Sequence, residues 1–228
     1  MNDRHLKNNS RKRKVLGIDE AGRGPVFGPM IMCGALIYEN KLEQLSKIGV
    51  KDSKSLAPRK RVSLSSHIVE ILDDHILLEI SPKEIDDSVE KNELNLLEAR
   101  KMAELIEKLR PDIAYVDSPQ KSTERYTKKI REGLSFEPKI IAENYAEIKY
   151  PIVAAASILA KVKRDRIIES LRQKYGDFGS GYPADGRTKE FLVQWYKRHK
   201  SFPEEVRRSW KTIKNIVRGK DSKQKTLF

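Results

Sequence analysis

A nearly continuous run of apolar residues, Met30 to Tyr38, constrains the fold of this chain most strongly. A strand that is apolar at successive positions is buried on both faces, which places it inside a sheet covered on both sides. A shorter apolar stretch, Val15 to Ile18, precedes it and ends at Asp19. The two stretches predict neighbouring strands joined by the glycine- and proline-rich loop 22–29.

The rest of the chain alternates between strand and helix patterns. Apolar residues at helical spacing, with Pro58, Pro111 and Pro151 near the ends, predict where the helices begin and end. The layout is that of an α/β fold with a mixed sheet, followed after Gly181 by a small C-terminal helical appendage. The expected further strands are 75–80, 113–116 and 139–142, and the expected helices are 55–72, 94–109, 122–131, 151–175, 188–199 and 203–218.

Composition excludes several classes of protein. The chain has no stretch of 18 apolar residues, so we expect no membrane span. Its N-terminus is polar and basic and lacks the apolar core of a signal peptide, which predicts a cytoplasmic protein. The single cysteine, Cys33, lies in the apolar run and is expected to be a buried thiol in a reducing compartment.

The net charge of +13 is concentrated at the two ends of the chain. Residues 1–14 hold six Lys/Arg and one acid, and residues 187–228 hold 13 Lys/Arg and four acids, while the middle is close to neutral. Basic ends on a neutral body indicate a polyanionic partner such as nucleic acid. The alternative is a basic surface that serves solubility alone.

Acidic residues stand at the ends of two predicted strands. Asp19 and Glu20 follow one strand, and Asp117 follows another. Ligand sites of α/β sheets lie at the carboxyl ends of strands, and carboxylates there are suited to hard divalent cations. Because adjacent strand residues face opposite sides, Asp19 and Glu20 share a site only if the strand stops or bends beside Gly22. The alternative is a pair of ordinary surface acids.

The loop Gly22-Arg23-Gly24-Pro25 lets the backbone approach a ligand, and Arg23 adds charge for phosphate. Its glycine spacing matches neither a dinucleotide-binding loop nor a P-loop. Tyr182, between Gly181 and Pro183, is a candidate for stacking on a sugar or base, or else packs its turn onto the core.

Other polar residues are more ambiguous. Asp165 falls on the predicted inward stripe of the helix opened by Pro151, where an acid either binds a ligand or pairs with a neighbouring Arg or Lys. Lys161, Lys163 and Arg164 on the same helix are phosphate contacts or a solvated charged face. The four histidines show no zinc spacing.

Five short blocks stand in order along the chain. They are Gly17-Ile18-Asp19-Glu20-Ala21-Gly22-Arg23-Gly24-Pro25, Asp52-Ser53-Lys54, Tyr115-Val116-Asp117, Ala155 to Asp165, and Gly179-Ser180-Gly181-Tyr182-Pro183. In this order they resemble the type 2 ribonucleases H, the ribonuclease HII family, and archaeal members in particular. The resemblance covers about residues 14–215.

The resemblance implies a ribonuclease-H-like, five-stranded mixed sheet flanked by helices. It implies cleavage of the RNA strand of RNA/DNA hybrids and incision at single ribonucleotides embedded in duplex DNA, with Mg²⁺ or Mn²⁺ as cofactor and with 3′-hydroxyl and 5′-phosphate ends. The metal-binding acids would be Asp19, Glu20 and Asp117. Gly22, Arg23 and Gly24 would read the 2′-hydroxyl, Tyr182 would stack at the ribonucleotide, and Lys54 and Lys161 would position phosphates.

The fourth acid departs from the family, because Glu147 stands where an aspartate is usual. We predict that Glu147 is catalytic, with Asp165 as the alternative. The tail, Gln224 to Phe228, is similar to a shortened sliding-clamp motif; the alternative is a disordered basic tail.

The expected organisation is a basic arm (1–13), a catalytic domain (14–176), a helical substrate-binding region (177–218) and a flexible tail (219–228), in a monomer. A non-catalytic nucleic-acid binder and a branched-DNA resolvase on the same fold are the competing classes.

Overall fold

The computed structural model describes residues 12–50 and 57–219 of the chain. Its centre is a five-stranded sheet of order β3-β2-β1-β4-β5. β1 pairs antiparallel with β2, β2 antiparallel with β3, and β1–β4 and β4–β5 are parallel. The predicted mixed sheet is therefore confirmed. The strands are β1 (Lys14–Ala21), β2 (Met30–Tyr38), β3 (Asp74–Ile80), β4 (Ile113–Asp117) and β5 (Lys139–Glu143).

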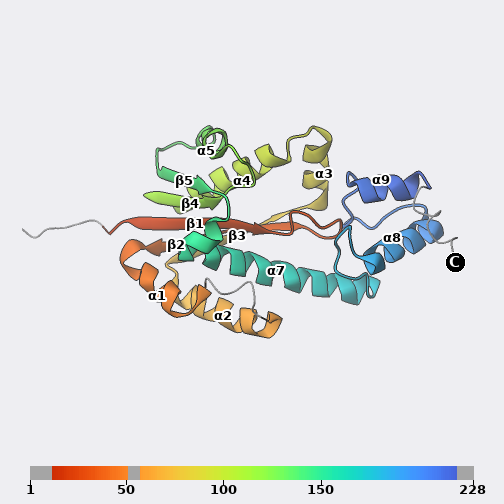
Figure 1. Ribbon diagram of the computed structural model, residues 1–228, viewed down its shortest axis with the longest axis horizontal. Helices are drawn as coiled ribbons and strands as arrows, with labels where there is room; N and C mark the ends of the chain where they lie inside the picture. Colours follow the sequence, from red (N-terminus) through yellow and green to blue (C-terminus); the bar gives the residue numbers. More distant parts are fainter. Residues whose placement is uncertain (1–11, 51–56, 220–228) are drawn as a thin grey trace, which may run out of the picture.

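Helices cover both faces of the sheet, which Figure 1 shows edge-on. One face carries α1 (Leu42–Lys47), after a short 3₁₀ turn (Glu39–Lys41), α2 (Pro58–Ile71) and the long α7 (Pro151–Tyr175). The other carries α3 (Pro82–Glu90), α4 (Leu94–Leu109) and α5 (Thr123–Arg131). Within the described ranges, no helix is both long enough and apolar enough to cross a membrane.

Alternation along β1 and β2 divides the buried residues into two cores. Val15, Ile31 and Cys33 pack with α7, whereas Leu16 and Ile18 pack with α4 and α5. β2 is buried from Met30 to Ile37, which agrees with its nearly continuous apolar sequence. Cys33 is a buried free thiol, as expected.

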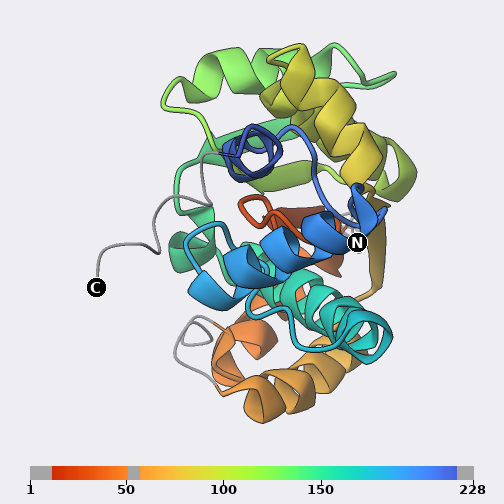
Figure 2. The ribbon, with the colours of Figure 1, turned by 90° about the vertical axis from the view of Figure 1, so that its right-hand side faces the viewer.

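A third core joins the C-terminal helices to the loop after β1. α8 (Gly186–His199) and α9 (Lys211–Val217) lie at one end of the molecule (Figures 1 and 2). Phe27 stacks on Phe178, with ring centroids 4.2 Å apart, inside a cluster that also includes Leu192, Val206 and Ile213. The appendage is thus packed against the residues that follow the first strand.

The predicted helix 203–218 is wrong in its first half. Only Lys211–Val217 is helical, and the segment before it consists of turns. Val206 forms an isolated antiparallel bridge with Phe27, and the side chain of Arg207 is buried under the loop. These tertiary contacts outweigh the helical spacing of the apolar residues.

The sequence prediction also missed three short helices: α1, α3 and α6 (Ala146–Lys149). A start signal for α3 was present, because Ser81 and Glu84 form a capping box in which each side chain bonds the backbone of the other.

Candidate active site

Asp19 and Glu20 lie within β1, which continues without a break to Ala21. Asp19 is paired with Cys33, Glu20 with Met32 and Ala21 with Ile31 of β2. The strand stops beside Gly22, as the sequence suggested, but it does not bend between the two acids, so their side chains face opposite sides of the sheet. Asp19 faces Ser157 of α7, and Glu20 lies near Glu98 of α4.

The end of β4 explains how two acids on opposite faces still belong to one site. The pairing of β1 with β4 ends at Ile18 and Val116, one residue before Asp19 and Asp117. Beyond this level no strand among the described residues lies beside β1 on that side, so both of its carboxylates border the space beyond β4. Asp117, the last residue of β4, lies level with Asp19 and on the same face.

Glu147 approaches this group from the segment after β5. The Asp117 carboxylate oxygen Oδ1 accepts a hydrogen bond of 2.8 Å from the backbone N–H of Ala146, which anchors the start of α6 beside β4. Glu147 is the next residue, and its Oε2 atom is buried. The carboxyl groups of Asp19, Asp117 and Glu147 thus gather from three separate elements.

The electrostatics of Asp19 reflect this crowding. Burial, with smaller contributions from the charges of Asp117 and Glu147, raises its pKa to about 7, although hydrogen bonds from Ser157 and from the Glu20 backbone act in the opposite direction. Without a compensating cation, the group therefore retains a proton more readily than an ordinary aspartate.

Glu20 lies close to a second buried acid, Glu98, which was not predicted from the sequence. Burial raises the pKa of Glu20 well above its usual value, and Asp19 and Glu98 add to the effect. Burial likewise raises the pKa of Glu98, against the lowering effect of Arg23. The Oε2 atoms of both glutamates are buried and accept no hydrogen bond among the described residues.

Side-chain donors hold the loop after β1 by its carbonyl oxygens. Arg207, fully buried, donates to the carbonyls of Gly28 at 3.0 Å, Arg23 at 2.8 Å and Gly22 at 2.6 Å. Arg164 donates to the Phe27 and Pro29 carbonyls, and the Trp210 indole N–H donates to that of Gly24. Because these carbonyls are occupied from within the protein, the loop is held in one backbone conformation.

Gly22 is required by this packing. Its φ of +88° lies in the left-handed region, and a Cβ atom at this position would come 2.2 Å from Nε of Arg164. The loop backbone therefore rests directly on a buried guanidinium, and no other residue fits.

Arg23 is only partly available for the phosphate contact predicted for it. Its Nε donates to Glu98 at 2.7 Å, and its Nη2 donates to Asn95 at 2.7 Å. Two of its donors are thus used to tie the loop to α4.

The other predicted substrate-binding residues surround one cavity of about 740 Å³. It is lined by Glu20, Gly22, Arg23 and Gly24 on one side and by Lys161 and Tyr182 on another. The turn packs onto the core through the buried Gly181, whose carbonyl oxygen accepts hydrogen bonds from the backbone N–H groups of Val26 and Phe27, but the ring of Tyr182 is 47% exposed. Its ring lies against Gly24, where an added Cβ would meet it at 3.7 Å. Lys54 lies outside the described residues.

Asp165 does not occupy the inward position predicted for it. Its side chain is 54% exposed and forms an ion pair of 2.9 Å with Arg61 of α2. The preceding residue, Arg164, faces inward instead. The error in register is one residue, which rotates a helical side chain by about 100°.

The site residues that were not predicted from the sequence differ in how clearly their sequence context indicates them. Glu98 stands four residues before Met102 and seven before Leu105, so it falls on the buried stripe of α4, as an unusual acid. Ser157 and Arg207 carried no comparable signal, because their roles depend on segments more than 100 positions away in the sequence. Arg164 was expected to contact phosphate or to lie on a solvated face, but it is buried and donates to the loop carbonyls instead.

The donor set fits a hard divalent cation. All the converging groups are carboxylates, and Glu20 offers a buried oxygen that no group of the described residues satisfies. In the described part of the chain, no three acids are close enough to form a ready-made ligand cluster.

The sheet order, with acids on its two central parallel strands and a cavity walled by a glycine loop, defines the class of ribonuclease-H-like nucleases. A family model for ribonuclease HII matches residues 16–213. The chain belongs to the ribonuclease HII family.

Individual relatives agree with this assignment. Ribonuclease HII of Pyrococcus abyssi is 49% identical over 89% of this chain and 91% of its own length. The crystal structure of ribonuclease H2 from Pyrococcus horikoshii has a TM-score of 0.86 at 50% identity, covering 91% of this chain and 99% of that one. A PCNA:RNase HII complex from Archaeoglobus fulgidus gives 0.82 at 42%, covering 93% and 98%. The chain is thus an endoribonuclease that acts on RNA paired with DNA.

Proposed function

We propose that this ribonuclease incises duplex DNA at single embedded ribonucleotides, as well as cutting RNA/DNA hybrids, by a two-metal mechanism. The observation that carries the proposal is the convergence of Asp19, Asp117 and Glu147 with Glu20 at the edge of the cavity lined by Gly22 and Gly24. In this arrangement the acids that would bind metal and the loop backbone that would contact ribose face the same nucleotide.

Asp19, Glu20 and Asp117 would hold Mg²⁺ or Mn²⁺, because each offers carboxylate oxygen beside the end of β4. Bound cations would supply an activated water and would neutralise the charge that develops on the departing 3′-oxygen. The buried positions of the acids keep competing water away and strengthen their electrostatic interactions. The expected products carry 3′-hydroxyl and 5′-phosphate ends.

The loop Gly22–Gly24 would select ribose through its backbone. Its carbonyls are occupied by Arg207 and Trp210, so the groups left to address a ligand are its N–H donors and its open Gly24 face. A 2′-hydroxyl is the group that separates RNA from DNA at such a contact. Tyr182 would stack on the same nucleotide, and Lys161 would bind a phosphate in the cavity.

Glu147 is the better candidate for the fourth acid. Its charge acts on Asp19, and it follows the backbone N–H that binds Asp117. Asp165 is engaged with Arg61 and is more than half exposed.

The direct test is a duplex that contains one ribonucleotide, incubated with Mg²⁺ or Mn²⁺ or with a chelator. We expect a nick at the ribonucleotide only when metal is present and none in the all-DNA duplex. Binding without a metal-dependent nick would instead support a non-catalytic binder. Preference for branched DNA without regard to ribose would support a resolvase.

A sliding clamp is a proposed partner, because a PCNA:RNase HII complex of Archaeoglobus fulgidus is among the similar structures. The residues in question, 224–228, lie outside the described part of the chain. Deleting them should abolish retention on a purified clamp and leave incision of a short duplex unchanged; absence of binding by the intact chain would end the proposal. We further propose a cytoplasmic monomer.

A further inference from the structure

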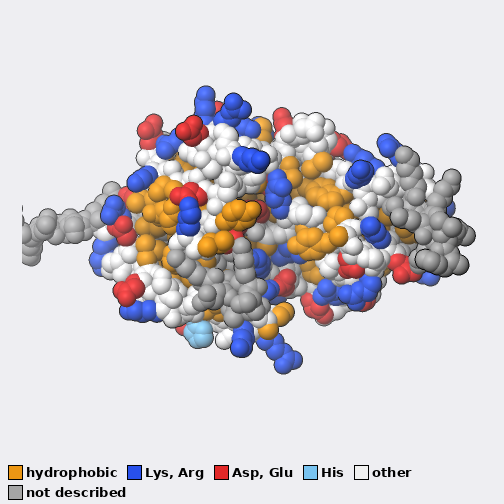
Figure 3. Space-filling view, viewed as in Figure 1, with side chains coloured by type: hydrophobic (Ala, Val, Ile, Leu, Met, Phe, Trp, Pro, Cys, Tyr) orange, Lys and Arg blue, Asp and Glu red, His pale blue; other side chains and the backbone are white. Residues whose placement is uncertain are grey.

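Large exposed apolar side chains gather beside the acids. Tyr145 is 69% exposed and Ile148 57% exposed, and they stand on either side of Glu147 in the sequence. The backbone N–H of Ile148 donates to the carbonyl oxygen of Tyr145 at 3.0 Å, so the two residues lie next to each other at the start of α6. Exposed apolar surface of this kind marks contact sites when it is clustered. Figure 3 shows hydrophobic surface lying among Lys and Arg side chains across the middle of this face.

The backbone at Tyr145 is held in an unfavourable conformation. Its φ of 57° and ψ of 37° are left-handed, which is uncommon for a bulky residue. The other non-glycine residues with positive φ in the described ranges stand just after helices, where this conformation is a common terminating turn: Arg110 and Lys200 directly, and Asn92 after one intervening residue. Tyr145 precedes a helix, so helix termination does not explain it.

Anchors on both sides of Tyr145 maintain this conformation. Asn144 donates from Nδ2 to the carbonyl of Gln120 at 2.9 Å and to that of Ser118. Ala146 donates its N–H to Asp117 at 2.8 Å. Both neighbours are thus tied to the end of β4, and the tyrosine between them is turned outward. Strain maintained beside a catalytic group is characteristic of functional positions.

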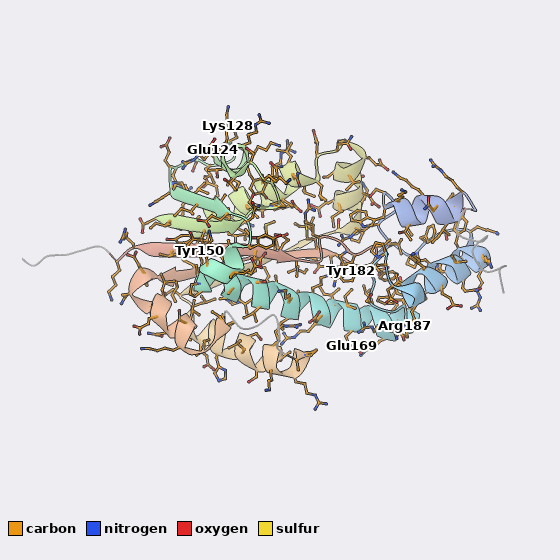
Figure 4. All side chains as sticks on the ribbon, viewed as in Figure 1. Glu124, Lys128, Tyr150, Glu169, Tyr182 and Arg187 are labelled. Carbon is orange, nitrogen blue, oxygen red and sulfur yellow. The ribbon has the colours of Figure 1, made fainter. Side chains whose placement is uncertain are left out.

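Tyr145 and Tyr182 belong to opposite ends of the site. Tyr150, which directly follows α6, and Tyr182 are well separated along the long axis of the molecule (Figure 4). Tyr182 lies against Gly24, whereas Tyr145 is beside the anchor of Asp117. A strand bound across the acids along this axis would pass one tyrosine before the cut and the other after it.

We propose that Tyr145, supported by Ile148, is a second stacking platform, which contacts a nucleotide of the cleaved strand on the side of the cut away from Tyr182. Aromatic stacking on bases tolerates any sequence, which suits an enzyme that acts wherever a ribonucleotide occurs. This inference rests on the proposed incision of embedded ribonucleotides.

The test compares Tyr145→Asn with Tyr145→Phe. Asparagine tolerates the left-handed backbone and removes the ring, whereas phenylalanine keeps the ring. Steady-state nicking of a duplex with one central ribonucleotide should show KM about 10-fold higher for Tyr145→Asn, equivalent to ~1.4 kcal/mol, with kcat little changed. Tyr145→Phe should match the wild type, as should Val69→Asn, which removes an exposed apolar side chain from α2.

Shortened duplexes locate the contact. Removing base pairs on one side of the ribonucleotide should abolish the difference between Tyr145→Asn and wild type, while shortening the other side should preserve it. Unchanged KM for Tyr145→Asn, an effect independent of both truncations, or equal kcat losses in the Asn and Phe variants would overturn the inference. A wild-type chain that fails to nick with metal would instead refute the proposed function, so the two failures are distinguishable.

Discussion

Arg207 links the C-terminal segment to the loop that borders the acids, and replacing it by methionine tests that linkage. The guanidinium is fully buried and donates to three carbonyls, of Gly28, Arg23 and Gly22. Burial and the neighbouring charge of Arg164 lower the pKa of Arg207, which means that the charged guanidinium is disfavoured at this position. Part of the stabilisation from its three hydrogen bonds therefore offsets the cost of burying the charge. Methionine retains the length of the stem and removes all three donors.

The expected loss of stability follows from those contacts. Leaving a buried carbonyl without a donor costs about 1–3 kcal/mol, and relief of the buried charge returns part of the sum, so we expect a net loss of about 3 kcal/mol. For a chain of this size that lowers Tm by about 6–12 °C. Thermal unfolding followed by circular dichroism measures it.

Arg208→Met is the matched control, because it removes the same charge from the adjacent, exposed position. We expect a change within about 0.5 kcal/mol there. If the two variants are equally stable, the carbonyl contacts of Arg207 do not hold the loop, and the reasoning is refuted. The milder Arg207→Lys should fold and yet lose discrimination for ribose, measured as the ratio of nicking rates on ribonucleotide and all-DNA duplexes.

Three further predictions concern the site itself. Gly22→Ala should lose nicking and stability through its clash with Arg164. Gly176→Ala, with similar φ but open space, should show only the backbone cost of about 1–3 kcal/mol and should keep nicking; loss of nicking in both variants, or in neither, would contradict the clash. Because the pKa of Asp19 in the folded protein is raised to about 7, the metal-free wild type should lose stability as the pH rises from about 4 to 7. The free energy of unfolding, measured by urea titration at each pH, should fall less with pH in Asp19→Asn; the same dependence on pH in both proteins would argue against the raised pKa. Glu147→Gln should abolish nicking while Asp165→Asn preserves it, and the reverse result would make Asp165 the fourth acid.

Periodicity predicted much of the fold, because it reports burial directly. The apolar run at 30–38 and the helical stripe at 94–109 have few alternative explanations, and both elements occur where predicted. The predicted helix from 203 failed because the turn around Arg207 is stabilised by bonds to residues about 180 positions earlier, which no local pattern records.

The site was predicted unevenly for the same reason. Asp19, Glu20 and Asp117 were identifiable as acids at strand ends, and the order of the motif blocks supplied the family. Asp165 was misplaced by one residue on its helix, and the buried Glu98 was overlooked although it lies on an apolar stripe. Helical phase is sensitive to such small shifts because each residue turns the side chain by about 100°.

The sequence by itself determined the class of fold, the positions of acids at strand ends and the family, since these depend on residue type, order and short-range spacing. Only the tertiary structure decided which side each acid faces, that Arg23 is tied to Glu98, and that Arg164 and Arg207 support the glycine loop. These features depend on where one segment crosses another. The free energy of burying a charge depends on the partners that such a crossing provides, and local sequence does not encode them.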